Sequence, residues 1–216
     1  FRPRIERYPR LHVKHHVKCQ TWDERYSEDG YAFGTEANDF LRDSATALKI
    51  GDTLVLGDGE GRNGVFLAQQ GHHVVTVDLS VVGVAKANKL AAERGTSIDA
   101  RVADLADFDM GRDKWDNIVS IFCHVPSALR RRVHANVRAA LRPGGRYLLE
   151  SYNAANIGRG TGGPQIPDLT VEVEELEADF MGWQFEVHRA VDRNIVEGKY
   201  HDGHSSTVQF IAVKPP

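Results

Sequence analysis

The sequence predicts an α/β protein with a Rossmann-like, doubly wound sheet of seven mostly parallel strands that ends in an antiparallel β-hairpin. Three observations predict this class. From residue 53 onward, apolar runs of strand length alternate with helical patterns, as in βαβ units. A segment with four glycines follows the first of these runs. Near the end of the chain, two β-rich stretches are joined by a connection too short for a parallel crossover.

The first four strands are marked by short apolar runs. The helix behind the first strand is expected at residues 64–70. Ser80 is a typical N-cap residue and predicts a second helix, which would end near residue 94 because Gly95 is a typical C-terminal stop. The four strands are expected at residues 53–56, 74–77, 98–102 and 117–122.

The next part of the chain continues the alternation. A helix is expected at residues 127–141, with arginine and leucine in its last turn. A Pro-Gly-Gly segment at 143–145 interrupts it, because proline and glycine are poor helix formers. The fifth strand is expected at residues 147–150.

The end of the chain departs from this rhythm. A loop rich in glycine and proline at 158–167 leads to an acidic helix at 170–181. Two β-rich stretches follow, at 184–196 and 207–213, and a polar turn at 197–206 joins them. Strands joined by so short a turn must be antiparallel, so we expect a hairpin at one edge of the sheet.

The composition suits one globular domain at residues 21–216, preceded by a basic arm at residues 1–20. The chain has 216 residues, of which 41% are hydrophobic and 26% charged, and this is ordinary for a globular protein. Its 27 basic and 30 acidic side chains argue against nucleic acid as a partner. No apolar run approaches the roughly 18 residues that span a bilayer, so no membrane partner is expected.

The cysteines and the basic arm give expectations about the cellular compartment of the protein. Cys19 and Cys123 are the only cysteines and lie far apart in the sequence, which predicts no disulfide framework and a reducing, cytoplasmic environment. Residues 1–18 contain six basic side chains against Glu6 alone. We interpret them as a solvated arm; the alternative, a trimmed targeting segment, would direct the protein to an organelle.

The glycine-rich segment VLGDGEGRNGVF (55–66) predicts a cofactor loop, and its register distinguishes two cofactors. The apolar strand ends directly before Gly57. In that register a dinucleotide site would need a third glycine at position 62, where Arg62 would obstruct packing against a pyrophosphate. The G-x-G-x-G pattern of S-adenosylmethionine sites is instead complete, with Gly57, Gly59 and Gly61. The terminal hairpin also favours this methyl donor, because it is foreign to the dinucleotide fold.

Seven stretches carry a resemblance to a known family. They are WDERY (22–26), YAFGTEANDFL (31–41), LGDGEGRNGVFLAQQGHHVVTVDLS (56–80), ADL (103–105), SIFCHVP (120–126), LRPGGRYLLE (141–150) and GTGGP (160–164). From about residue 21 to 213 the chain resembles the class I S-adenosylmethionine-dependent methyltransferases, and among them the small tellurite-resistance-like and thiopurine-like enzymes. The resemblance implies S-adenosyl-L-methionine as cofactor and S-adenosyl-L-homocysteine as product, and it says little about the acceptor.

The resemblance also implies where the cofactor is held. Asp78 would bind the ribose hydroxyls, with Leu79 and Ser80 beside the adenine; the alternative for Asp78 is a helix cap. Asp104 would face the adenine amino group, unless the acidic segment around it is a solvated turn. The implied cofactor residues are Tyr31, Phe33, Gly57, Asp58, Gly59, Gly61, Arg62, Asn63, Asp78, Leu79, Ser80, Ala103, Asp104, Leu105 and Ile121.

One position departs from the family pattern. An acid often stands two residues before the first loop glycine, and here that position is Val55. The ammonium group of the methionine moiety would then be held by backbone carbonyls of the loop, or by Asp58 or Glu60. We expect the carbonyls to hold it.

An aromatic group precedes the first strand. Trp22 is expected to pack on the edge of the sheet as part of an N-terminal helix. Tyr31 and Phe33 flank Gly34 in an irregular stretch, which suits a lid over the bound cofactor. Such a lid would exclude water from the sulfonium and strengthen its attraction for an anion.

The acceptor side is expected after the fourth and fifth strands. The substrate candidates are Phe122, Tyr152 and Asn153, and the catalytic candidate is His124. His124 would act as a base or orient the substrate, and capping of the next helix is an equal alternative. Cys123 has no paired base evident in the sequence and is expected to be a buried packing residue.

These features predict methyl transfer to a small, soft nucleophile, a thiol or a tellurium or selenium oxyanion, by in-line displacement. Such an acceptor needs little base catalysis, whereas an amine or hydroxyl needs a proton acceptor. The alternatives are a small-molecule N- or O-methyltransferase and a module that binds S-adenosylmethionine without turnover. The protein is expected to be a monomer or a homodimer.

Ten histidines suggest a metal site, but their spacing does not support one. No closed zinc pattern with cysteines and no H-E-x-x-H motif occurs, so no metal is expected. His201 and His204 fall in the polar turn of the hairpin and are expected to be solvated. The loop at 158–164 follows the fifth strand and is either an acceptor-side loop or a flexible connector.

Overall fold

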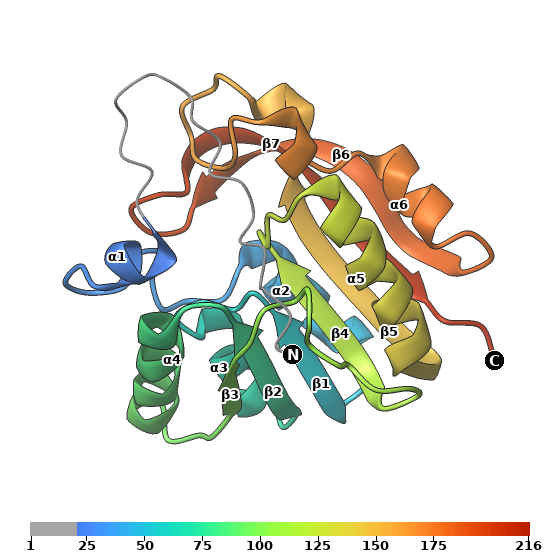
Figure 1. Ribbon diagram of the computed structural model, residues 1–216, viewed down its shortest axis with the longest axis horizontal. Coiled ribbons are helices and arrows are strands. Elements are labelled where there is room, and N and C mark those ends of the chain that lie inside the picture. The colour runs from blue at the N-terminus through green and yellow to red at the C-terminus, as the bar shows by residue number, and fades with distance from the viewer. Residues whose placement is uncertain (1–20) are drawn as a thin grey trace, which may run out of the picture.

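The structure, a computed structural model, describes residues 21–216. One seven-stranded sheet runs through it in the order β3-β2-β1-β4-β5-β7-β6, and helices cover both of its faces (Figure 1). The predicted α/β class and sheet are therefore confirmed. The predicted basic arm at residues 1–20, with Cys19, lies outside the described residues.

Strands and helices alternate in the predicted order. The strands are β1 (Asp52–Leu56), β2 (His73–Asp78), β3 (Asp99–Val102), β4 (Trp115–Ile121), β5 (Leu141–Tyr152), β6 (Gln184–Val196) and β7 (Asp202–Val213). The α-helices are α1 (Trp22–Tyr26), α2 (Asp39–Ser44), α3 (Arg62–Gln69), α4 (Val81–Glu93), α5 (Ser127–Ala140) and α6 (Val173–Asp179). Short 3-10 turns are η1 (Ala45–Ala47), η2 (Ala154–Asn156) and η3 (Pro167–Leu169).

The pairing of the strands brings four strand ends together. β3, β2, β1, β4 and β5 pair in parallel, and β7 joins β5 and β6 in antiparallel register. The hairpin predicted at the edge of the sheet is thus confirmed. In a parallel sheet the carboxyl ends of the strands share one edge, so the segments after β1, β2, β4 and β5 meet there.

Alternation along the strands determines which helix covers which face. Leu54 and Leu56 of β1 pack in one core cluster with Val137 of α5. Val55 points to the other face and packs with Leu67 of α3. Because successive side chains of a strand point to opposite faces, a strand covered on both sides is apolar throughout, and this is what made β1 recognisable.

Four elements differ most from the prediction. α3 begins two residues early, because Gly61 has a left-handed conformation (φ +90°) at its N-cap. β5 continues through the Pro-Gly-Gly segment, since a shift of register between β4 and β5 absorbs the extra residues as a bulge. β7 begins at Asp202, five residues early, so the hairpin turn is confined to 197–201. The acidic helix is shorter than predicted, at Val173–Asp179.

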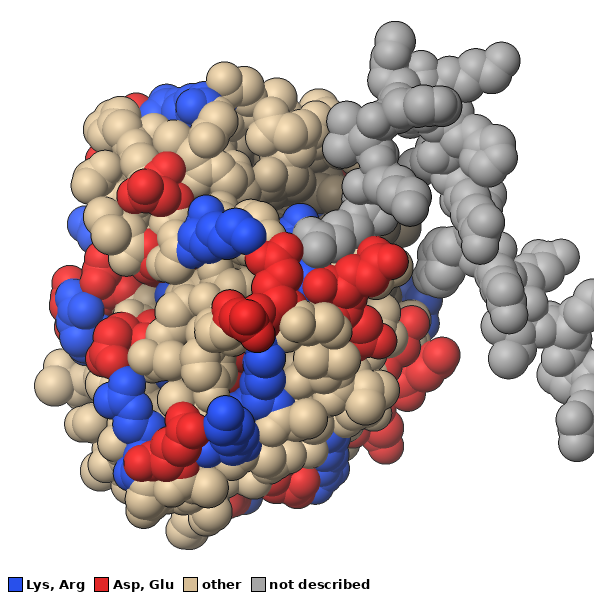
Figure 2. Space-filling view, turned by 90° about the vertical axis from the view of Figure 1, so that its left-hand side faces the viewer, with Lys and Arg blue, Asp and Glu red and all other residues tan. Residues whose placement is uncertain are grey.

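One face of the molecule shows how its surface charges are distributed. On the face drawn in Figure 2, acidic and basic side chains are interspersed. That face thus carries no continuous basic stripe of the kind that follows a nucleic acid backbone. Within residues 21–216 no helix combines the length and the apolar character needed to cross a membrane.

Candidate active site

Three glycines form a tight loop between β1 and α3. Gly57, Gly59 and Gly61 have φ angles of +62°, +57° and +90°, which other residues rarely adopt. At Gly57 a Cβ atom would also lie 2.6 Å from the Sγ of Cys123. The loop therefore requires glycine, and its backbone is open to close approach by a ligand at the carboxyl end of the sheet.

Asp78 ends β2 beside this loop and braces it. One carboxylate oxygen accepts the N–H of Gly59 at 2.8 Å, and the other accepts the N–H of Ser80 at 2.9 Å. Burial raises the pKa of the Asp78 carboxyl, and the same N–H groups oppose that rise. The cap of α4 is Ser80, whose hydroxyl oxygen accepts the N–H of Gly83 at 2.9 Å. Asp78 is thus not the cap, and it occupies the position where this fold class binds a ribose.

The two acids of the loop differ in what they bind. Glu60 accepts the N–H of Ala32 at 2.7 Å and pairs with Lys86 Nζ at 2.9 Å. Asp58 accepts the N–H of Gly64 at 3.1 Å, while its other oxygen is buried and has no hydrogen-bond partner within residues 21–216. Burial raises the pKa of Asp58 to about 7. Of the two acids, Asp58 is the one available to a cation.

Exposed apolar side chains lie at the ends of the neighbouring strands β2 and β3. Leu79 is 60% exposed and Val102 is 49% exposed, which provides an apolar surface for a planar ring beside the glycine loop. In the predicted segment 103–105, Asp104 accepts the N–H of Ala106 at 2.8 Å. Leu105 packs against the core instead of facing the loop.

Tyr26, which the sequence reasoning missed, covers the loop. Its side chain is 5% exposed, and a Cβ atom at Gly59 would lie 2.5 Å from its hydroxyl oxygen. Burial, and then the charges of Asp78 and Glu60, raise the pKa of Tyr26. Helix α1 is held there because Asp23 accepts the hydroxyl hydrogen of Ser80 at 2.5 Å. The helix start in WDERY could have signalled this contact, since Thr21 and Glu24 form a capping box.

The other predicted aromatic residues also lie on this edge. Trp22 stacks on Tyr26 with ring centroids 5.6 Å apart. Phe33 packs against Tyr26 at 6.3 Å and against His201 at 4.5 Å. Tyr31 packs beside α4, and its hydroxyl is buried without a hydrogen-bond partner in the described part of the chain. Phe33 thus joins the glycine loop to the hairpin turn, while Tyr31 lies to one side of it.

An aromatic cluster lies after β4 and β5. Phe122 stacks on Tyr152 with centroids 4.7 Å apart and meets His201 edge-on at 4.6 Å. Phe122 has a left-handed backbone (φ 50°), a strained conformation that often marks functional sites. Gly163 of the glycine-rich loop packs against the ring of Tyr152. The cluster therefore combines two predicted substrate residues with that loop and with His201.

The prediction that His201 is solvated is wrong. Its side chain is only 6% exposed, and its Nδ1 is buried without a partner in the described structure. Burial, and then the charge of Arg62, lowers the pKa of His201 well below its usual value. The reason lies in the early start of β7, which shortens the turn and folds it back onto the aromatic cluster. His204 is exposed, as predicted, with 69% of its side chain accessible.

His124 also adjoins this cluster. Its Nδ1 lies 3.5 Å from Ser151 Oγ, and its Nε2 is buried without a partner within residues 21–216. Burial lowers the pKa of His124 to about 4. The alternative that it caps the next helix is wrong, because the N-cap of α5 is Pro126. Cys123 has the character of a packing residue, since burial raises the pKa of its thiol to about 12.

A buried ionic network, also missed from the sequence, holds the two halves of the site together. Glu150 is fully buried and accepts hydrogen bonds from Arg193 at 2.7 and 2.8 Å and from Asn38 at 2.7 Å. Glu197 pairs with Arg193 at 2.9 Å and with Arg62 at 2.7 Å. The network links the start of α3 to the hairpin turn. An acid inside the apolar strand YLLESY was the signal that could have revealed it.

The remaining predicted site residues lie at or near the carboxyl ends of the strands. Asn63 accepts the N–H of Asn38 at 3.0 Å and so ties α3 to the segment before α2. Asn153 follows β5, and its Oδ1 is buried without a partner in the described residues. Ile121, the last residue of β4, is buried in the core. Ala103 follows β3 and donates its N–H to the carbonyl of Asp78 at 2.9 Å.

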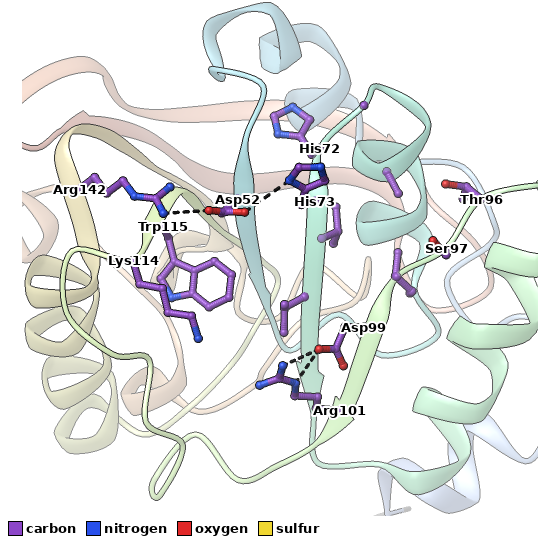
Figure 3. Close-up of a pocket in the computed structure, with 15 residues that line it drawn as sticks. Asp52, His72, His73, Thr96, Ser97, Asp99, Arg101, Lys114, Trp115 and Arg142 are labelled. Atoms are coloured by element: carbon purple, nitrogen blue, oxygen red, sulfur yellow. Dashed lines mark hydrogen bonds and ion pairs between the residues drawn. The ribbon is translucent and has the colours of Figure 1, made fainter.

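A groove of about 810 Å³ lies at the opposite, amino-terminal edge of the sheet (Figure 3). Two ion pairs lie along it: Arg142 binds Asp52 at 2.8 Å, and Arg101 binds Asp99 at 2.5 Å. Ligands of open α/β sheets bind outside the carboxyl ends of the strands, so this groove is not the candidate site. Within residues 21–216 no group of three or more His, Cys, Asp or Glu side chains is arranged to hold a metal ion.

Comparison with known proteins supports the predicted resemblance. Residues 54–145 match the family model described as a methyltransferase domain. The chain is 29% identical over 133 residues to 2-heptyl-1-hydroxyquinolin-4(1H)-one methyltransferase of Mycobacteroides abscessus. That match covers 60% of this chain and 58% of the relative, so the chain spans less than two thirds of the relative's length.

Two solved structures share the fold. TehB from Haemophilus influenzae is 19% identical, with a TM-score of 0.69, and the match covers 82% of this chain and 62% of that one. A structure described as the conversion of a disulfide bond into a thioacetal group during echinomycin biosynthesis is 18% identical, with a TM-score of 0.69 and coverage of 85% and 83%. Residues 54–145 therefore resemble a methyltransferase domain, and the chain shares its fold with solved structures that are described as S-adenosylmethionine-dependent methyltransferases.

Proposed function

We propose that this protein transfers the methyl group of S-adenosylmethionine to a small, soft nucleophile, a thiol or a tellurium or selenium oxyanion, by in-line displacement. The observation that carries the proposal is the glycine loop braced by Asp78 at the carboxyl ends of β1 and β2. The aromatic cluster after β4 and β5 provides an acceptor side at the same edge.

The residues present fit this cofactor. Backbone groups of the loop would line the methionine moiety, and its ammonium would lie against loop carbonyls or the unpartnered oxygen of Asp58. Asp78 would accept the ribose hydroxyls. Leu79, which follows β2, and Val102, at the end of β3, would contact the adenine. This contact would explain why two apolar side chains are exposed there.

The chain's own contribution to the reaction is alignment and exclusion of water. When bound, the cofactor supplies an electrophilic methyl carbon on a sulfonium. Phe122 and Tyr152 would orient the acceptor in line with that carbon, where alignment accounts for much of the rate. Tyr26 and Phe33 would close over the loop and keep water out.

A second candidate is methyl transfer to oxygen or nitrogen of a small molecule. It is favoured by the similarity to an enzyme named for a hydroxyquinolone. Labelled S-adenosylmethionine with a panel of thiols and hydroxyquinolines would separate the two. A labelled thioether supports the first, a labelled quinoline supports the second, and tight binding without any product would favour a non-catalytic module.

The cofactor assignment is tested by calorimetric titration. We expect S-adenosylmethionine and S-adenosylhomocysteine to bind, and NAD to give no measurable heat of binding. The reason is that Arg62 takes the position of the third glycine that a pyrophosphate requires. Affinity for NAD together with no response to either methionine derivative would overturn the proposed function.

Replacement of His124 tests whether a base is used. With a pKa near 4, neutral His124 is a weak proton acceptor for a thiol of pKa about 8.5. We therefore expect His124→Ala to raise the apparent KM for the acceptor about 2- to 10-fold, the usual effect of a lost neutral hydrogen bond, and to leave the pH dependence of kcat unchanged. A loss in kcat of roughly 10²–10⁴-fold that high pH restores would instead identify a general base.

A further inference from the structure

The acceptor side contains several buried polar atoms that have no hydrogen-bond partner within residues 21–216. They are Tyr152 Oη, His201 Nδ1, Arg62 Nη1, Asn153 Oδ1 and His124 Nε2. Unpartnered buried polar atoms are rare in folded proteins, because each has lost its water without a replacement. Several at one edge of the sheet point to a ligand that would supply the missing partners.

Four of these atoms belong to residues that are more than nine-tenths buried, and one of the four residues is Asn153, which is 4% exposed. Tyr152 is fully buried, His201 is 6% exposed and Arg62 is 7% exposed. The ring centroids of Tyr152 and His201 are 5.4 Å apart, and both rings contact Phe122. Arg62 pairs at 2.7 Å with Glu197, which lies in the same hairpin turn as His201. The three groups thus come from β5, the hairpin turn and the start of α3, which meet beside the aromatic cluster.

All three groups can donate a hydrogen bond. Tyrosine has a hydroxyl hydrogen, a neutral imidazole carries one N–H, and a guanidinium only donates. The carboxylates nearby are already engaged: Glu197 pairs with Arg62 and Arg193, and Glu150 with Arg193. Donors are therefore available there and a strong base is not.

We propose that Tyr152 and His201 bind the methyl acceptor as an anion, through hydrogen bonds donated to its negatively charged atom. This inference rests on the proposed function. The acceptor would lose its proton to water before it binds, and acidic thiols, phenols and chalcogen acids would be selected over weakly acidic acceptors. Because the site selects an acceptor that is already deprotonated, no general base is needed to remove its proton.

The turn at 197–201 packs against the aromatic cluster through His201. It carries His201, and its Lys199 donates its N–H to the carbonyl of Ala32 at 3.0 Å. Because the rings of Phe122, Tyr152 and His201 are in contact, binding of an acceptor between them requires His201 to move away from the other two rings. The anion then replaces ring contacts with hydrogen bonds.

The test uses 4-nitrophenol, whose anion is coloured, with protein loaded with S-adenosylhomocysteine. We expect the nitrophenolate to bind and 4-nitroanisole, its neutral methyl ether, to bind at least about tenfold more weakly, since a hydrogen bond to a charged group is roughly twice as strong as a neutral one. The apparent pKa of the bound phenol should lie below that of the free phenol. Tyr152→Phe and His201→Phe keep the rings and remove the donors, and each should weaken nitrophenolate binding about 10–100-fold, the range for a hydrogen bond to an ion.

Matched controls and outcomes separate this inference from the proposed function. Tyr147→Phe, in the same strand but on the opposite face, and His204→Phe, on the exposed side of β7, should leave nitrophenolate binding unchanged. S-adenosylhomocysteine affinity equal to wild type shows that each variant is folded. If S-adenosylhomocysteine binds but nitrophenol binds only in its neutral form, not at all, or equally well in Tyr152→Phe and His201→Phe, this inference is wrong. If S-adenosylhomocysteine itself does not bind, the proposed function fails.

Discussion

Asp78→Ala is expected to weaken the binding of S-adenosylhomocysteine by at least about 100-fold. Two ribose hydroxyls would each lose a hydrogen bond to a charged group, at roughly 1.5–3 kcal/mol apiece. The variant also frees the N–H groups of Gly59 and Ser80, which the carboxylate holds in place. Calorimetric titration of wild type and variant measures the effect.

The variant should stay folded, because Asp78 lies at the open end of β2 and contributes no apolar contact to the core. Asp99→Ala is the matched control: its carboxylate pairs with Arg101 at the start of β3, away from the glycine loop. We expect the control to bind S-adenosylhomocysteine as wild type does. If a folded Asp78→Ala protein binds S-adenosylhomocysteine with unchanged affinity, another residue must contact the ribose.

Glu150→Ala is expected to lower the free energy of unfolding by about 3–5 kcal/mol, the usual result of removing one partner of a buried ion pair. Glu150 is fully buried and accepts hydrogen bonds from Arg193, Asn38, Thr207 and Gln209. Without it, those donors lose their acceptor inside the protein. Urea denaturation, followed by circular dichroism, measures the change.

Glu186→Ala is the control for this loss. Glu186 of β6 pairs with Arg146 of β5 at 2.8 Å, and both side chains are partly exposed. Such pairs contribute about 0–1 kcal/mol. If Glu150→Ala, like the control, loses less than about 1 kcal/mol, the prediction is wrong. Glu197, which lies 2.9 Å from Arg193, would then be sufficient to neutralise the charge of Arg193 by itself.

The centre of the sheet could be predicted because its strands are buried on both faces. β1 and β4 are buried at nearly every position, and each contains a short apolar run, at residues 54–56 and 118–119, from which the strand could be recognised. The Pro-Gly-Gly segment was harder. Proline and glycine indicate a break, and only the pairing of β4 with β5 shows that the chain passes through it as a bulge.

The candidate site was predicted in part. The glycine loop and Asp78 were recognisable because they depend on local backbone geometry and on a strand end. Tyr26 and His201 were not, because each is buried by residues far away in the sequence. His201 contacts Phe33 and Phe122 only because the shortened hairpin turn returns to the carboxyl edge of the sheet.

The sequence by itself determined the α/β class, the register of the cofactor loop and the antiparallel end of the sheet, since period-two burial and glycine conformations are local properties. The tertiary structure alone decided which polar side chains share a buried space. Glu150 meets Arg193 and Asn38, and Tyr26 covers Gly59, because strand order brings distant segments together. A buried charge requires a partner, but the sequence does not show which residue that partner is.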